Sequence, residues 1–262
     1  MTPFGFALRF YLGLGAPAVR RRYPDCTVRA AAAYSPDLVR TLLSLYVGQA
    51  GPEVGRSEPV KPGSSHLTLA SGEQFFFKEF PRRHAGHDLE RALRISRVDR
   101  AWRAAHLLPH LGLHTPAAVG TARRREANGS ITEYLATVWL EGAVQFPVAL
   151  PASGPERADM LREFAALMRR CHRSGVYTRD LVKNVLVQTE GSARTYSMVD
   201  LDGVHPLRRV TRRRILFHMK QLAHYCPLSE EEARVVCEEY LGTTEGKWAA
   251  AVREALRPSG HS

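Results

Sequence analysis

Three segments of this 262-residue chain carry polar side chains where their types and spacing could support chemistry. Lys78 follows three consecutive phenylalanines, and a lysine on a buried strand is costly unless it meets an anion such as a nucleotide phosphate. Asp180 and Asn184 lie just before an apolar run, where a carboxylate can accept a hydroxyl proton and an amide oxygen can bind Mg²⁺. Asp200 ends a second apolar run and is a possible metal ligand.

Each segment also has a purely structural interpretation. Lys78 could lie on the solvent side of an edge strand. Asp180 and Asn184 could cap a turn through their own backbone. Asp202-Gly203, directly after the third segment, could be an ordinary turn. Taken one at a time, the three segments leave these alternatives open.

The elements that must position Lys78 are strands and one long helix. Alternating apolar residues predict strands over 66–70 and 74–80, with Ser71-Gly72 as the turn. The remaining elements predicted in this half are a helix over 36–47, a loop over 48–65, a helix from Asp88 to Leu111, and strands over 117–121 and 131–140 around a turn at 123–129.

The second half of the chain is predicted to be helix-rich. A capping box at Ser153 to Glu156 predicts a helix that ends near Gly175, and a second box at Ser229 to Glu232 predicts another. Two short strands are expected over 184–188 and 196–201. The loop before the first of these strands holds Asp180 and Asn184, so it would present both side chains from one rigid element.

Composition narrows the class of protein. With 44% hydrophobic and 24% charged residues the chain is globular rather than disordered, and no run is long and apolar enough to cross a membrane. Four cysteines without a CxxC pair argue against a disulfide scaffold and a structural zinc site, and favour a reducing, intracellular compartment. The net charge of +11 would attract nucleic acid, an anionic membrane face or a phosphorylated substrate.

Residues 1–50 form an N-terminal extension with two interpretations. Its apolar run contains Arg9 and is followed by three arginines, Arg20 to Arg22, which is the wrong order for a secretory signal. The extension could be a membrane-proximal anchor, with aromatic residues in the interface and arginines on lipid phosphates. It could equally pack on the core.

The order of the three segments is that of the protein-kinase signature set: a strand lysine, a helix, an Arg-Asp-Leu loop with asparagine, and a strand-end aspartate. The chain resembles the lipopolysaccharide core kinase family, the Kdo and heptose kinases, from about Val60 to about Leu241. The motifs that carry the resemblance are Phe-Phe-Phe-Lys78, Ala101-Trp to Pro116, Val138-Trp-Leu-Glu-Gly142, Arg179-Asp180-Leu and Val199-Asp-Leu-Asp202.

The resemblance implies an α+β, two-lobed protein-kinase-like fold, with a small strand-rich N-lobe over 51–146 and a helical C-lobe over 147–262. It implies an ATP-dependent kinase that phosphorylates a sugar hydroxyl on Kdo or heptose of the lipopolysaccharide inner core. ATP and Mg²⁺ would be the cofactors and an anionic glycolipid the acceptor. The protein would be cytoplasmic, with a possible position on the inner face of the cytoplasmic membrane and no nucleic-acid partner.

Roles for individual residues follow from the same resemblance. Asp180 would be the catalytic base, and Asn184 and Asp200 would hold Mg²⁺. The residues implied in ATP binding are Lys78 on the α- and β-phosphates, Gly63, Ser64 and Ser65 in the phosphate-covering loop, and Val138, Leu140 and Gly142 in the hinge.

The chain departs from the family pattern at several positions. Ala101 stands where the family has the glutamate that pairs with the strand lysine, and Thr178 replaces the usual histidine. The loop between Asp180 and Asn184 is one residue short. Two alternatives therefore remain: a phosphotransferase acting on a protein or another small molecule, and a weak, nucleotide-binding pseudokinase.

Overall fold

A computed structural model describes residues 2–12, 18–81, 96–127, 129–207, 209–243 and 245–257. Two compact units make up the chain. The strand-rich unit comprises Arg9–Pro109 and Thr115–Leu140, and the helix-rich unit comprises Met1–Leu8, His110–His114 and Glu141–Ser262. Helix α1 (Pro3–Leu12) contains the first junction between them. The main division, at Leu140, lies slightly before the boundary after residue 146 that was expected from sequence.

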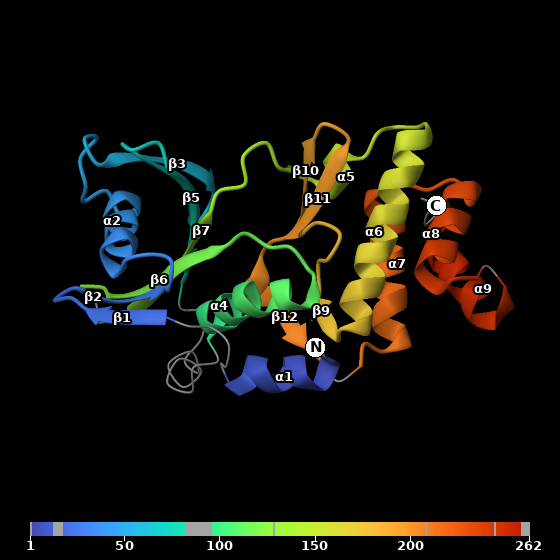
Figure 1. Cartoon of the computed structure of the whole chain (residues 1–262), viewed down its shortest axis with the longest axis horizontal. Coiled ribbons are helices and arrows are strands. Elements are labelled where there is room, and N and C mark those ends of the chain that lie inside the picture. The colour runs from blue at the N-terminus through green and yellow to red at the C-terminus, as the bar shows by residue number, and fades with distance from the viewer. Residues whose placement is uncertain are drawn as a thin grey trace. The chain divides into compact units, whose positions relative to one another are not determined.

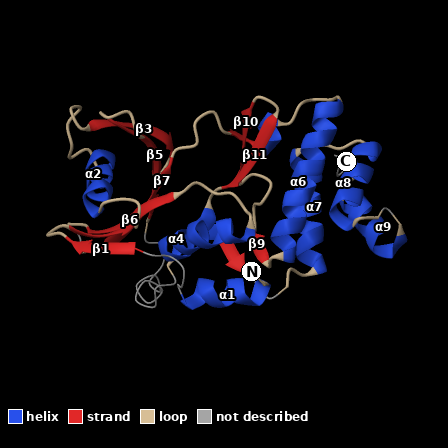
Figure 2. Cartoon of the chain, viewed as in Figure 1, coloured by secondary structure: helices blue, strands red, loops and turns tan. Residues whose placement is uncertain are grey.

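The strand-rich unit is built on one antiparallel seven-stranded sheet with the order β1-β2-β6-β7-β5-β4-β3 (Figures 1 and 2). Its elements are β1 (Ala18–Arg22), β2 (Cys26–Ala31), α2 (Pro36–Tyr46), β3 (Gly55–Lys61), β4 (Ser64–Leu69), β5 (Gln74–Phe80), α4 (Arg97–Leu107), β6 (Ala118–Arg125) and β7 (Ile131–Val138). Residues 18–46, part of the segment expected to be an extension, thus belong to the sheet and to the helix packed on it.

Alternation along the strands explains how the sheet buries its core. Leu67 on β4 and Phe75 and Phe77 on β5 point to the face that α2 covers, where Val39 and Leu42 pack against them. Every second residue of a strand faces the same side, so the apolar half of each strand meets the helix. The hairpin expected over 66–80 is therefore confirmed.

Two predictions in this unit are wrong. Residues 55–61 form strand β3 rather than part of a loop, since an exposed edge strand tolerates the proline and charges that made the segment read as irregular. The helix expected from Asp88 to Leu111 is described as α4 with Ser96 as its N-cap, followed by a 3₁₀ turn over Leu108–Leu111. Residues 88–95, and Asn128 in the expected turn, lie outside the described residues.

The helix-rich unit contains short strand pairs and four longer helices in its described part (Figure 2). Its elements are the second half of the 3₁₀ turn Leu108–Leu111, β8 (Val144–Gln145), α5 (Phe146–Ala149), α6 (Pro155–Arg173), β9 (Val176–Thr178), β10 (Val185–Glu190), β11 (Ala193–Met198), the 3₁₀ turn Leu201–Gly203, β12 (Val204–Pro206), α7 (Arg212–Tyr225), α8 (Glu230–Leu241) and α9 (Gly246–Ala255). Strand β10 pairs with β11 and β8, and β9 pairs with β12.

The two expected capping boxes have opposite outcomes. Ser229 caps α8 by accepting a hydrogen bond from the backbone of Glu232, whose carboxylate returns one to Ser229, as predicted. The box at Ser153 is wrong. The N-cap of α6 is Gly154, in a conformation with φ of 96°, and it makes no side-chain cap hydrogen bond. Ser153 precedes the cap by one residue, so its hydroxyl is out of register with the first turn.

All four cysteines are buried and unpaired, and burial raises the pKa of Cys171 to about 12. Among the described residues, no helix combines the length and the apolar character that crossing a bilayer requires.

Candidate functional site

The β10–β11 hairpin brings Asn184 and Asp200 to the same end. Val185, the first residue of β10, pairs with Met198, the last residue of β11, so Asn184 lies beside Val199 and Asp200 follows one residue further along. The backbone N–H of Val199 donates to the carbonyl of Asn184 over 2.8 Å. Both residues are partly buried. An amide oxygen and a carboxylate are thus placed on one rigid support.

Asp180 is attached to this support through a short turn. The backbone N–H of Asn184 donates to the carbonyl of Asp180 over 3.0 Å, which closes the four-residue spacing into one turn. Leu181 and Val182 within the turn are buried at 1% and 0% exposure, whereas Asp180 is exposed. The apolar pair anchors the turn and leaves the carboxylate available. The turn that was expected as the purely structural interpretation of Asp180 and Asn184 is therefore present, and it also leaves the Asp180 side chain exposed.

Helix α7 contacts the Asp180 carboxylate. The Nε2 amide of Gln221 donates to Oδ1 of Asp180 over 3.4 Å. The other amide atom of Gln221, Oε1, is buried and has no hydrogen-bond partner among the described atoms. Because a carboxylate only accepts, this contact also fixes which way the Gln221 amide points.

Asp200 has a backbone conformation that non-glycine residues rarely adopt. Its φ and ψ are 56° and 46°, in the left-handed region, and it is the one described non-glycine residue with positive φ. The backbone N–H of Gly203 donates to the carbonyl of Asp200 over 3.2 Å as the chain enters its 3₁₀ turn. Aspartate tolerates this region better than most residues, but the conformation still stores strain, and such strain concentrates at functional sites.

A chain of buried hydrogen bonds supports the strand that leads into Asp180. His218 on α7 contacts the Thr178 carbonyl through Nε2 over 2.8 Å, and its Nδ1 lies 2.8 Å from Nε2 of His172 on α6. The Nδ1 of His172 lies 2.6 Å from the hydroxyl of Tyr240 on α8. A carbonyl can only accept, so His218 donates to it, His172 donates to His218, and Tyr240 donates to His172. Three helices are thereby tied to one backbone atom.

Both histidines of this hydrogen-bond network, His172 and His218, are held neutral. Burial lowers the pKa of His218 to about 4, against smaller opposing effects of Thr178 and Asp180. Burial, and secondarily His218, lowers the pKa of His172 to about 3. A proton on either ring would replace the acceptor nitrogen that the chain requires. The sequence did not reveal this pair, because its members lie on different helices far apart in the chain.

Lys78 occupies a central strand of the strand-rich unit. Strand β5 lies between β4 and β7, so the edge-strand interpretation of Lys78 is wrong. Lys78 pairs in register with Ser64, and the Nζ lies 5.1 Å from the centre of the Phe80 ring. The backbone N–H of Glu79 donates to the carbonyl of Gly63 over 2.8 Å, which links the β3–β4 turn to this strand.

The expected phosphate loop is therefore a hairpin turn beside Lys78. Gly63 sits at the turn with a φ of 73°, and Ser64 and Ser65 begin β4 with side chains that are almost fully buried. Within this unit the structure thus brings Gly63, Ser64 and Lys78 together on neighbouring strands, as a phosphate-binding arrangement would require.

The expected hinge coincides with the division of the chain into units. Val138 ends β7, Leu140 is the last residue of the strand-rich unit, and Gly142, with a φ of 67°, lies in the helix-rich unit. The backbone N–H of Trp139 donates to the Gln74 carbonyl over 3.1 Å. A glycine with positive φ suits a segment where the chain changes direction.

Helix α4 is anchored to the sheet by a buried cluster of charges. Asp99 accepts from Arg29 on β2 over 3.2 Å and from Arg123 on β6 over 2.7 Å, and Arg123 also donates to Glu133 on β7 over 2.7 Å. Asp99 and Glu133 are 2% and 0% exposed. Ala101, at the position of the family's glutamate, is buried and supplies no charge. Asp99 thus forms ion pairs with Arg29 and Arg123. The sequence did not reveal this cluster because its members come from three separate strands as well as α4.

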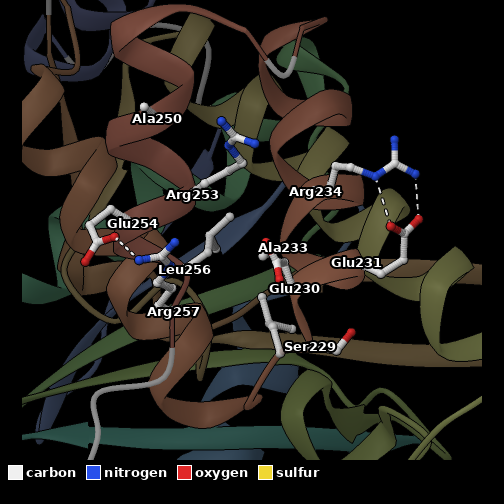
Figure 3. A pocket seen from close by; sticks show the side chains of 11 residues that line it. Ser229, Glu230, Glu231, Ala233, Arg234, Ala250, Arg253, Glu254, Leu256 and Arg257 are labelled. Atoms are coloured by element: carbon white, nitrogen blue, oxygen red, sulfur yellow. Dashed lines mark hydrogen bonds and ion pairs between the residues drawn. The ribbon is translucent and has the colours of Figure 1, made fainter.

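A different region holds a cavity of about 970 Å³ between α8 and α9 (Figure 3). Its charged side chains pair locally: Arg234 with Glu231 at 2.6 Å and Arg257 with Glu254 at 2.8 Å. No residue predicted to bind ATP or Mg²⁺ lines it. The cavity is a feature of the helical surface, distinct from the site built by Asp180, Asn184 and Asp200.

The donor set at the β10–β11 end fits Mg²⁺. Within the described ranges, no group of three or more His, Cys, Asp or Glu side chains could hold a metal ion. Asn184 and Asp200 supply an amide oxygen and a carboxylate, which are hard ligands. Mg²⁺ commonly takes only one or two protein carboxylates and completes its shell with water and substrate phosphates.

Two solved structures are similar to this chain. The solved structure of WaaP in complex with acyl carrier protein matches with a TM-score of 0.49 and 18% identity, over 77% of this chain and 87% of that one. The MAP kinase LmaMPK10 from Leishmania major matches with a TM-score of 0.41 and 15% identity, over 84% of this chain and 66% of that one. A search of curated proteins found no match.

A match to a family model identifies the family of this chain. Residues 70–240, more than half of the chain, match the model of the lipopolysaccharide kinase (Kdo/WaaP) family. The matched span runs from the strand of Lys78 through the Asp180 turn and Asp200 to the end of α8. The chain belongs to the lipopolysaccharide kinase (Kdo/WaaP) family, and its α+β fold is protein-kinase-like.

Proposed function

We propose that this protein is an ATP-dependent kinase that phosphorylates a sugar hydroxyl of the lipopolysaccharide inner core, on Kdo or heptose. The observation that carries the proposal is the end of the β10–β11 hairpin. There the backbone of Asn184 is hydrogen-bonded to that of Val199, the residue before Asp200, and to that of Asp180. Family membership supplies the reaction class.

The residues of the helix-rich unit would act on the acceptor and the metal. Asp180, exposed on its anchored turn, orients the attacking hydroxyl and accepts its proton. Asn184 and Asp200 hold Mg²⁺, which neutralises charge on the transferred phosphoryl group. The His218 contact to Thr178 and the Gln221 contact to Asp180 keep the turn in place.

The residues of the strand-rich unit would bind ATP. Lys78 contacts the α- and β-phosphates, and the turn of Gly63 with Ser64 and Ser65 covers them through backbone N–H groups. Val138 and Leu140, together with Gly142 of the helix-rich unit, would contact the adenine. The support for this assignment is that Lys78 and Ser64 are cross-strand neighbours and that the Gly63 carbonyl is tied to the Lys78 strand.

The acceptor is proposed to be an anionic glycolipid reached at the inner face of the cytoplasmic membrane. The net charge of +11 favours an anionic surface. Helix α1 exposes Leu8, Tyr11 and Leu12 at 47%, 59% and 61%, which is the apolar face that an interfacial helix presents to lipid. The protein itself would be cytoplasmic and peripheral.

A second candidate function is a nucleotide-binding protein with weak or no turnover. The observation that favours it is Ala101, which is 1% exposed on α4 at the position of the family's lysine-pairing glutamate. Asp99, the nearest carboxylate on α4, is already bound by Arg29 and Arg123. Within the described part of α4, the family's carboxylate therefore has no counterpart beyond Asp99.

Thermal unfolding with ATP tests the nucleotide site. Wild type, Asp200→Ala and Glu190→Ala are heated with ATP, with and without Mg²⁺; Glu190 is the exposed carboxylate at the opposite end of the same hairpin. A ligand at 100 times its Kd stabilises the folded state by about 2.7 kcal/mol. We expect a Mg²⁺-dependent rise in Tm for wild type and Glu190→Ala that Asp200→Ala lacks.

Turnover separates the two candidates. The kinase transfers the γ-phosphate of ATP to purified inner-core acceptor, and Asp180→Asn abolishes the transfer. A protein that binds MgATP but never turns over with inner-core acceptor is the pseudokinase instead. No ATP-dependent rise in Tm under any condition contradicts both candidates.

A further inference from the structure

The outer part of the large sheet encloses a second, smaller cavity. Its volume is about 140 Å³. The residues that line it come from β1, β2, β6 and α4, and are Arg20, Thr27, Val28, Arg29, Asp99, Thr121 and Arg123. None of the residues assigned to ATP, Mg²⁺ or the acceptor hydroxyl lines this cavity, so it needs its own explanation.

The strand register explains why arginines gather there. Arg20 on β1 lies opposite Arg29 on β2, which lies opposite Thr121 on β6. Residues directly opposite each other in an antiparallel pair share one face of the sheet. One row across three strands therefore presents two guanidinium groups and one hydroxyl.

A second row runs beside the first. Arg22 on β1 lies opposite Thr27 on β2, which lies opposite Arg123 on β6. The two rows together, named here the arginine grid, present four arginines and two threonines on the side of the sheet where α4 lies, with Arg20, Arg22 and Thr27 exposed. Arg21, between the rows in sequence, points to the other face, where it pairs with Asp37 of α2 at 2.9 Å.

The carboxylates near the arginine grid leave it positively charged. Asp99 and Glu133 neutralise Arg29 and Arg123. Within the described part of the chain, the side chains of Arg20 and Arg22 have no ion pair or hydrogen bond. Anchoring α4 thus accounts for Arg29 and Arg123, but it gives no reason for the two arginines of β1 or for Thr27.

The pKa of Arg29 responds to this excess of positive charge. Burial lowers the pKa of Arg29 to about 10; Asp99 opposes that shift, and the charges of Arg123 and Arg20 add to it. An anion placed in the cavity would relieve the repulsion among these cations. Guanidinium forks and threonine hydroxyls are donors that suit phosphate, which accepts hydrogen bonds on several sides at once.

We propose that the arginine grid is a binding site for a phosphate-monoester anion, separate from the ATP site. Arg20, which lines the cavity, and Arg22, at its edge in the second row, are the principal ligands because their donors are not engaged within the described part of the chain, and Thr27 lies directly opposite Arg22. Arg29 and Arg123 contribute their remaining N–H groups. The anion could be carried by a lipid headgroup or by a soluble molecule, and both sources share this chemistry.

Titration with inorganic phosphate tests the site. Isothermal calorimetry compares wild type with Arg20→Gln/Arg22→Gln, and with the control Arg21→Gln/Arg124→Gln, which removes two charges from the opposite face of the same strands. We expect saturable binding by wild type and the control, and at least tenfold weaker binding by the Arg20/Arg22 variant. Absence of saturable binding by wild type overturns the proposal, as does equal weakening in both double variants.

A vesicle arm identifies the source of the phosphate. The same three proteins are sedimented with phosphatidylcholine vesicles that contain phosphatidate, a lipid phosphate monoester. Loss of sedimentation in the Arg20/Arg22 variant alone supports a lipid headgroup. Equal sedimentation of all three proteins, together with a selective loss of phosphate binding in the Arg20/Arg22 variant, supports a soluble phosphate ester.

Discussion

Lowering the pH tests the buried histidine pair that supports the Asp180 turn. The folded-state pKa values of His172 and His218, about 3 and about 4, lie below the ordinary value of 6.5. The unfolded state therefore binds more protons than the folded state between pH 6.5 and pH 4. The stability that the neutral pair contributes is fully present above pH 6.5 and falls as the pH falls.

The magnitude follows from proton linkage. Between pH 7 and pH 5, a histidine that titrates at 6.5 when unfolded and stays neutral when folded lowers the free energy of unfolding by about 2 kcal/mol. Two such histidines lower it by about 4 kcal/mol. Other titrating groups add their own terms, so a variant is needed to isolate the pair.

His218→Gln isolates one histidine, because the glutamine amide can still donate to the Thr178 carbonyl. It leaves the His172 donor without its acceptor, at a cost of about 1–3 kcal/mol at pH 7. Urea unfolding at pH 7 and pH 5, followed by circular dichroism, should show about 2 kcal/mol less acid destabilisation than in wild type. His224→Gln, at an exposed histidine on the same helix, should match wild type. An unchanged pH dependence in His218→Gln would refute the reasoning.

Two further stability predictions rest on side-chain contacts. Ser229→Ala removes the α8 capping box and should lower the free energy of unfolding by about 1 kcal/mol, whereas Ser153→Ala, which removes no cap, should leave it unchanged in urea titrations. Asp99→Ala leaves Arg29 and Arg123 without their shared buried carboxylate and should cost about 3 kcal/mol or more; a loss under 1 kcal/mol would show that this cluster does not anchor α4.

Local signals in the sequence predicted a large part of the fold. The alternation over 66–80 predicted the β4–β5 hairpin, because one face of each strand is buried against α2. The capping box at Ser229 predicted the start of α8 because all of its hydrogen-bonding groups lie within four residues of sequence. Strand β3 was missed because an edge strand needs no apolar face. The capping box predicted at Ser153 was wrong because Gly154, the next residue, is the N-cap of α6.

For the candidate site, too, the sequence predicted some of the residues and missed the partners that hold them. Asp180, Asn184 and Asp200 were predicted from their residue types and their order along the chain, and one turn and one hairpin connect them. The partners that hold them could not be found. His172 and His218 meet only because α6 packs near α7, and Asp99 meets its arginines only through the strand order. Such contacts depend on packing between distant segments, which residue types alone do not specify.

The activity we propose for this chain is transfer of phosphate from ATP to a sugar of the lipopolysaccharide inner core. The most direct measurement incubates γ-labelled ATP, Mg²⁺ and purified inner-core glycolipid with wild type, Asp180→Asn and the exposed-surface control Asp159→Asn. We expect labelled glycolipid with wild type and Asp159→Asn, and at least a hundredfold less with Asp180→Asn. Labelling that persists in Asp180→Asn, or its absence in wild type that binds MgATP, would contradict this proposal.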